Sequence, residues 1–161
     1  MSEMGILGLL LAIGGITLVV SFIALGGLYL LFSYGLYKLA DRADVENSWL
    51  AFIPLVQYYT MGKVIKELKI GSWTVPYLPW VLLLAPFAYC ILAQIPIINT
   101  IISVLYVLFY IIVTYTLFKK YSHHALIMTI IGFFLPFMYP IFVFAIRNNH
   151  PITPDKINLM A

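Results

Sequence analysis

Residues 70–118 read IGSWTVPYLPWVLLLAPFAYCILAQIPIINTIISVLYVLFYIIVTYTLF and contain no charged side chain. A membrane-spanning helix needs about 20 apolar residues, so this run is long enough for two of them. The segment 94–100, which holds a proline and polar side chains, lies where a hairpin between two spans should turn. We therefore predict helices over residues 72–93 and 96–118.

Two more apolar segments flank this run. No charged residue occurs between Glu3 and Lys38, which predicts one long helix with a span over about residues 5–37. The last apolar segment, 125–146, contains two prolines and predicts a kinked fourth span. If this last segment instead enters the membrane and returns, the C-terminus lies on the other side.

The composition agrees with a lipid environment. Hydrophobic residues make up 63% of the 161 residues, charged residues 9%, and the mean hydropathy is +1.03. Soluble domains carry about 25% charged residues, so a soluble globule is excluded. The formal charge is only +3, and the basic residues cluster in short connections, which argues against binding of nucleic acid.

Residues 48–69 carry a different pattern, in which apolar side chains recur at helical spacing and lysines follow. The apolar part is too short to span a bilayer and contains Pro54, so we predict an amphipathic helix that lies in the headgroup plane. Its lysines are expected to contact lipid headgroups, in particular anionic ones; they are Lys63, Lys66 and Lys69.

These segments together predict an all-α polytopic helix bundle. It has four transmembrane helices and one interfacial helix within a transmembrane domain over residues 1–147, followed by a flexible polar tail over 148–161. Cytoplasmic loops carry an excess of Lys and Arg. With both termini outside, seven cationic residues face inward and only Arg147 and Lys156 face outward, so a multi-pass cell-membrane protein with both termini outside is expected.

A proline pattern recurs three times, at spacings of 42 and 40 residues: Ile53-Pro54-Leu55-Val56-Gln57, Ile95-Pro96-Ile97-Ile98-Asn99 and Leu135-Pro136-Phe137-Met138-Tyr139. Internal duplication is one explanation. The other is local physics, because proline is favoured in the first turn of a helix.

The order of these blocks along residues 34–147 resembles a family of small bacterial membrane proteins of unknown function. The resemblance rests on the Trp49-x-x-x-Ile53-Pro54 block, the Ile95-Pro96-x-x-Asn99 turn and the proline-rich last span. It implies a four-span topology and no chemical activity. The usual Tyr-Asn pair of the family's first block is replaced here by Val56-Gln57.

The predicted spans contain no ionisable Asp, Glu, Lys, Arg or His, whereas such residues inside a membrane usually mark transport paths or proton relays. The polar side chains that remain can line a path in an oligomeric channel or simply bond neighbouring helices. The candidates for either role are Gln94, Asn99, Thr100 and Ser103.

Groups suited to catalysis cluster only in the connections, at Asp41, Asp44, Glu46 and His123-His124. They match no metal, nucleophile or phosphate-binding motif, and the single cysteine excludes a disulfide within the chain. We therefore predict neither catalytic residues nor a metal or cofactor. The expected function is that of a non-catalytic accessory, scaffold or regulatory protein that binds lipids, another membrane protein or further copies of itself. The alternatives are an oligomeric small-solute channel and a lipid-modifying enzyme with a site at the inner surface.

Overall fold

The computed structural model describes the backbone of residues 3–152 and the side chains of residues 7–152. The described chain is all-α apart from one short hairpin of strands. Its first helix, α1 (Glu3–Arg42), runs without interruption through the predicted first span and beyond it. At about 1.5 Å per residue, this helix is about 60 Å long, twice the thickness of a hydrocarbon core.

The segment after α1 differs from the predicted interfacial helix. Residues 48–69 form a 3-10 helix, η1 (Ser48–Phe52), a turn at 53–55, and a separate helix, α2 (Val56–Ile65). Half of α2 is buried, including Met61, Val64 and Ile65. The prediction of one continuous helix over residues 48–69 is therefore wrong, and the apolar face of α2 packs against α1, α3 and α4. That this segment lies in the headgroup plane stays a prediction.

The two helices predicted over residues 72–93 and 96–118 are present, and the turn between them is confirmed. The first of them, however, begins later than predicted. Strands β1 (Lys69–Ile70) and β2 (Trp73–Thr74) form a hairpin around Gly71, whose φ of +63° favours glycine. Helix α3 (Leu78–Leu92) consequently begins after this hairpin and not at residue 72. Helix α4 (Pro96–Tyr121) begins at the predicted proline and continues three residues past the predicted end.

The last apolar segment is not one kinked helix. It forms α5 (Ala125–Phe134) and α6 (Met138–Ala145), which are separated by a turn at 135–137 and followed by a 3-10 helix, η2 (Ile146–Asn148). Helix α5 runs back along α4, and α6 then reverses direction beside α1. As a result Asn149, after η2, donates its side-chain amide to the carbonyl oxygen of Tyr121 at 2.7 Å. The two ends of the segment 125–146 therefore lie at the same end of the molecule.

All three proline patterns lie at reversals between paired helices. Pro54 lies in the turn between η1 and α2, Pro96 begins α4 after the turn that follows α3, and Pro136 lies in the turn between α5 and α6. Proline suits these places because it lacks the N–H that a helical interior requires and has its φ already set for a first turn. The pattern therefore marks hairpin tips.

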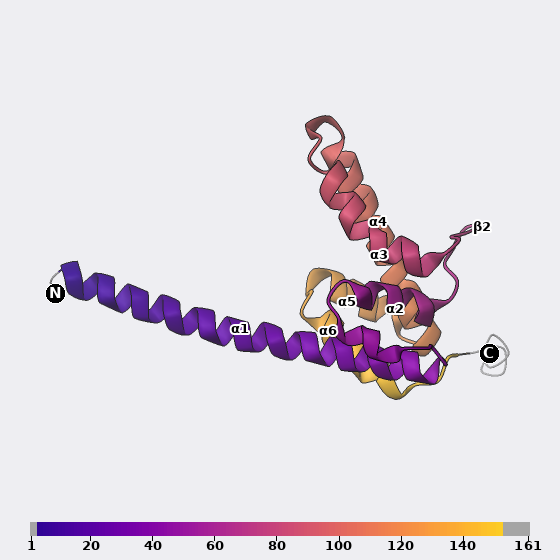
Figure 1. Ribbon diagram of the computed structural model, residues 1–161, viewed down its shortest axis with the longest axis horizontal. Coiled ribbons are helices and arrows are strands. Elements are labelled where there is room, and N and C mark those ends of the chain that lie inside the picture. The colour runs from indigo at the N-terminus through magenta and orange to yellow at the C-terminus, as the bar shows by residue number, and fades with distance from the viewer. Residues whose placement is uncertain (1–2, 153–161) are drawn as a thin grey trace.

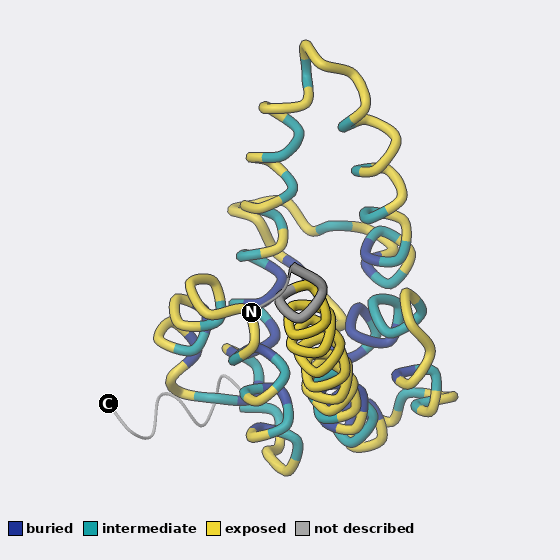
Figure 2. The backbone as a smooth tube through the Cα atoms, turned by 90° about the vertical axis from the view of Figure 1, so that its left-hand side faces the viewer, coloured by how far each residue is buried: buried dark blue, intermediate teal, exposed yellow. Residues whose placement is uncertain are grey.

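The molecule consists of a packed body from which two parts project (Figure 1). One projection is the α1 arm, which we define as residues 7–27, all of them exposed; the other is the outer part of the α3–α4 hairpin. Figure 2 shows that buried residues are concentrated in the body. Its fully buried apolar side chains include Leu36 and Leu39 of α1, Val64 of α2, Leu68 before β1, Leu78 of α3, Val113, Leu117 and Phe118 of α4, and Val143 of α6. By length and apolar composition, two described helices can cross a membrane, namely α1 and α4.

Two glycines allow the helices of the body to approach closely. A Cβ on Gly62 of α2 would lie 2.5 Å from the Cα of Pro79 in α3, and a Cβ on Gly35 of α1 would lie 2.9 Å from the Cα of Phe144 in α6. Real Cβ atoms do not approach backbone so closely. These two contacts set where α3 and α6 pack.

Candidate functional site

The cationic side chains gather at one end of the body, where α1, α2 and α4 end. The guanidinium of Arg42 donates to the carbonyl oxygen of Asn148 at 2.8 Å, which brings the end of α1 beside the end of η2. Arg147, expected on the opposite side, therefore lies at the same end as Arg42. Eight of the nine Lys and Arg residues lie here; they are Lys38, Arg42, Lys63, Lys66, Lys69, Lys119, Lys120 and Arg147. We call this region the basic end. Lys156 and the rest of the expected tail after residue 152 lie outside the described residues.

Lys120 holds two helices together at this end. Its ammonium group donates to the carbonyl oxygens of Val64 at 2.7 Å and Ile65 at 3.1 Å. These carbonyls lie in the last turn of α2, where helical acceptors lack partners and a positive charge interacts favourably with the helix dipole. Lys120 is therefore structural, whereas the neighbouring Lys119 is exposed.

A charged hollow of about 540 Å³ opens at the basic end. Asp44 and Glu46 line it from the loop after α1, and Lys63 and Lys66 line it from the end of α2. The loop is held against α1 by the backbone N–H of Val45, which donates to the carbonyl oxygen of Ala40 at 3.0 Å. The hollow thus carries two carboxylates and two ammonium groups on opposing segments.

The four charges of the hollow do not form ion pairs with one another. Within residues 7–152, the one ion pair is between Lys69 and Glu67, at 3.7 Å, and both side chains are 68% exposed. Exposed pairs of this kind contribute little to stability. The ammonium group of Lys63 lies 5.5 Å from the centroid of the Tyr59 ring, and Lys66 is exposed. Of the three predicted headgroup contacts, Lys63 and Lys66 share the hollow and Lys69 lies apart in β1.

The groups considered for catalysis do not converge. No set of three or more His, Cys, Asp or Glu side chains in the described part of the chain is placed to hold a metal ion. His124 occupies the N-cap position of α5, and its backbone N–H donates to the hydroxyl of Ser122 at 3.2 Å. The exposed His123 precedes it in the same turn.

The predicted polar path lies at the far tip of the α3–α4 hairpin. Ser103 donates to the side-chain oxygen of Asn99 at 3.0 Å and lies 3.3 Å from the hydroxyl of Tyr89. Gln94 donates to the carbonyl oxygen of Cys90 at 3.2 Å, and Thr100 is exposed. The contact between Ser103 and Tyr89 links α4 to α3, and the Gln94 side chain caps the end of α3. Polar side chains commonly make such contacts between helices in lipid.

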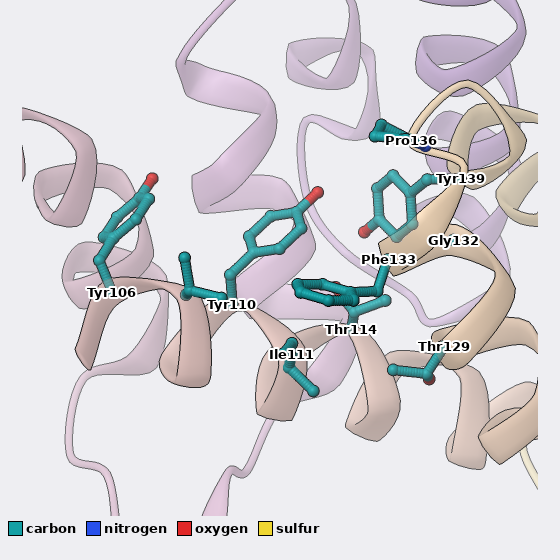
Figure 3. A pocket seen from close by; sticks show the side chains of 10 residues that line it. Tyr106, Tyr110, Ile111, Thr114, Thr129, Gly132, Phe133, Pro136 and Tyr139 are labelled. Atoms are coloured by element: carbon teal, nitrogen blue, oxygen red, sulfur yellow. The ribbon is translucent and has the colours of Figure 1, made fainter. Parts of the chain in front are cut away.

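Sequence reasoning missed a cavity between α4 and the α5–α6 hairpin, shown in Figure 3. Tyr106, Tyr110 and Thr114 line it from α4, and Tyr139 lines it from α6. The signal was present in the sequence, because residues 106, 110 and 114 are four apart and share one helix face. Its partner surface was not visible, since the reversal between α5 and α6 had been named only as the alternative to a full span.

The four-span family resemblance stays a prediction. Comparisons with protein families, with curated proteins and with solved structures found no match to this chain.

Proposed function

We propose that this chain is a non-catalytic integral membrane protein that binds anionic lipid headgroups at its basic end and serves as an accessory or scaffold for a membrane partner. The observation that supports this proposal is the gathering of eight cationic side chains at one end of the body, where they outnumber the four carboxylates Asp41, Asp44, Glu46 and Glu67. Anionic lipids attract each such side chain by about 1 kcal/mol near the surface.

The orientation follows from the same charges. Because cytoplasmic loops are rich in Lys and Arg, the basic end faces the cytoplasm. Helix α1 then enters from the outside, α3 and α4 form a hairpin from the inside, and η1–α2 and α5–α6 are re-entrant hairpins. This topology has three crossings, with the N-terminus outside and residue 152 inside. It differs from the expectation that both termini lie outside and corresponds to the alternative in which the last apolar segment enters the membrane and returns.

The lipid proposal is tested with spin-labelled phosphatidylglycerol in phosphatidylcholine nanodiscs. Electron paramagnetic resonance measures the association constant of the anionic lipid relative to phosphatidylcholine. We expect the double variant Lys63→Gln/Lys66→Gln to lower this ratio by at least about fivefold, since two cations near the headgroups are lost. Lys69→Gln/Lys119→Gln is the matched control, because it removes the same charge at two exposed lysines of the basic end that do not line the hollow, and it should lower the ratio less. An unchanged ratio in the double variant would contradict headgroup binding in the hollow.

The α1 arm is the surface proposed for the membrane partner, because residues 7–27 contact no other part of the described chain closely enough to be buried. A photo-cross-linking amino acid at Phe22, which is 81% exposed, is expected to give one adduct of defined mass in native membranes. The same probe at Leu126 on α5, which is 61% exposed, is the control for random collisions in the bilayer. Equal and diffuse adducts at both positions would remove the proposal that the arm binds a partner.

A further inference from the structure

The cavity between α4 and the α5–α6 hairpin has features that the headgroup and partner proposals do not use. Its volume is about 230 Å³. For scale, an apolar cavity of about 150 Å³ accepts a benzene molecule. The cavity therefore has room for a substituted six-membered ring. Phe133, at its wall, is 50% exposed, so the cavity opens sideways to the surroundings of the helices.

One buried hydroxyl in the wall lacks a partner. Thr114 is only 4% exposed, and its Oγ1 lies beside the hydroxyls of Tyr110 and Tyr139 without a hydrogen bond of good geometry to either. The hydroxyls of Thr116 and Thr129 each donate to the carbonyl oxygen four residues earlier at 2.8 Å. Leaving a buried donor unsatisfied costs about 1–3 kcal/mol. The Thr114 hydroxyl can therefore donate to an acceptor that enters the cavity beside the hydroxyls of Tyr110 and Tyr139.

The remaining walls are mainly aromatic. The ring centroids of Tyr110 and Tyr139 lie 5.9 Å apart with a tilt of 55°, and Figure 3 shows both rings at the cavity beside Phe133. The hydroxyl of Tyr139 donates away from the cavity to the sulfur of Met61 at 3.3 Å. Aromatic rings favour offset or edge-to-face packing with another ring. Such walls suit a flat ring better than a flexible acyl chain.

We propose that this cavity binds the ring of a quinone-type membrane lipid, with the Thr114 hydroxyl donating a hydrogen bond to a ring carbonyl oxygen. The ring packs against Tyr110, Tyr139 and Phe133, and its hydrocarbon tail leaves through the lateral opening. The proposal concerns binding alone and involves no electron transfer. It is independent of the basic end, since none of the four charged residues of the hollow lines this cavity.

The test uses a photoreactive azidobenzoquinone with a decyl tail on the full-length protein in nanodiscs. We expect labelling within residues 106–114 or 129–139, and competition by unlabelled decylbenzoquinone but not by decylbenzene, which lacks the carbonyl groups. Thr114→Val keeps the shape and removes the hydroxyl, so it should reduce labelling about threefold to tenfold. Thr116→Val is the matched control on the same helix and should leave labelling unchanged.

A second variant fills the cavity. Gly132→Leu places a large side chain in its wall and should abolish labelling. If that variant does not fold, Gly132→Ala serves instead, because its Cβ would meet Tyr139 at an ordinary 3.9 Å. It should weaken labelling, because the added methyl group narrows the cavity that Gly132 lines. Labelling that spreads along the α1 arm would overturn the proposal. So would equal competition by decylbenzene together with an unchanged Thr114→Val variant, which would indicate a site for acyl chains.

Discussion

Gly62→Ala is expected to lower the stability of the protein by about 3 kcal/mol, at the upper end of the usual cost of overpacking. The added Cβ would lie 2.5 Å from the Cα and 2.8 Å from the nitrogen of Pro79. Both atoms belong to the backbone of α3, so no side chain can rotate away. Relief requires α2 and α3 to separate. The change should be visible as a lower midpoint of thermal unfolding and a lower yield of monodisperse protein in mild detergent.

Gly27→Ala provides the control for this experiment. It makes the same change in a helix, but no atom lies within 4 Å of the new Cβ. Because alanine is a better helix former than glycine, Gly27→Ala should be neutral or slightly stabilising. Equal unfolding midpoints for Gly62→Ala and Gly27→Ala would show that α2 and α3 do not pack as described.

Residues Asp41 and Asn148 are expected to be accessible from the same side of the membrane. In a Cys90→Ser background, cysteines at these two exposed positions should react with an impermeant maleimide only in inside-out vesicles. A cysteine at Gln94, at the tip of the α3–α4 hairpin, should react only in right-side-out vesicles. The physical reason is the hydrogen bond from Arg42 to the carbonyl oxygen of Asn148, which places the ends of α1 and η2 together.

This labelling pattern distinguishes a re-entrant segment 125–146 from a segment that crosses the membrane once. If residues 125–146 cross the membrane as one helix, the cysteines at positions 41 and 148 react from opposite sides. Background labelling is measured with the Cys90→Ser protein, which has no other cysteine. The expected difference is all or none, because the reagent does not cross the bilayer.

The sequence was sufficient for the helices whose signals are local. The uncharged run from Glu3 to Lys38 predicted the first long helix, and Pro96 predicted the start of α4 to the residue. The lysines at 119 and 120 correctly placed the end of α4 within three residues. These features depend on composition and on the backbone geometry of single residues.

Two assignments failed for the same reason. The length and lysines of residues 48–69 were typical of one surface helix, yet the chain turns at Pro54 and the apolar face of α2 packs against α1, α3 and α4. The length of residues 125–146 was typical of a span, yet the chain reverses at Pro136. In both cases a proline interrupts the segment. A proline pattern shows where a helix breaks but carries no information about the direction of the next helix.

Features that depend on neighbouring residues could be predicted from the sequence, whereas the candidate sites depend on contacts between distant residues. The apolar character of the chain, its uncharged interior, the helical class and the positions of the proline turns follow from the sequence by itself, because each depends on residues that are close in the chain. The single basic end and the aromatic cavity were decided by tertiary structure. They depend on Gly35 approaching Phe144, on Gly62 approaching Pro79 and on Lys120 reaching α2. These contacts join residues far apart in sequence, and their free energy sets the direction in which each helix leaves its proline turn.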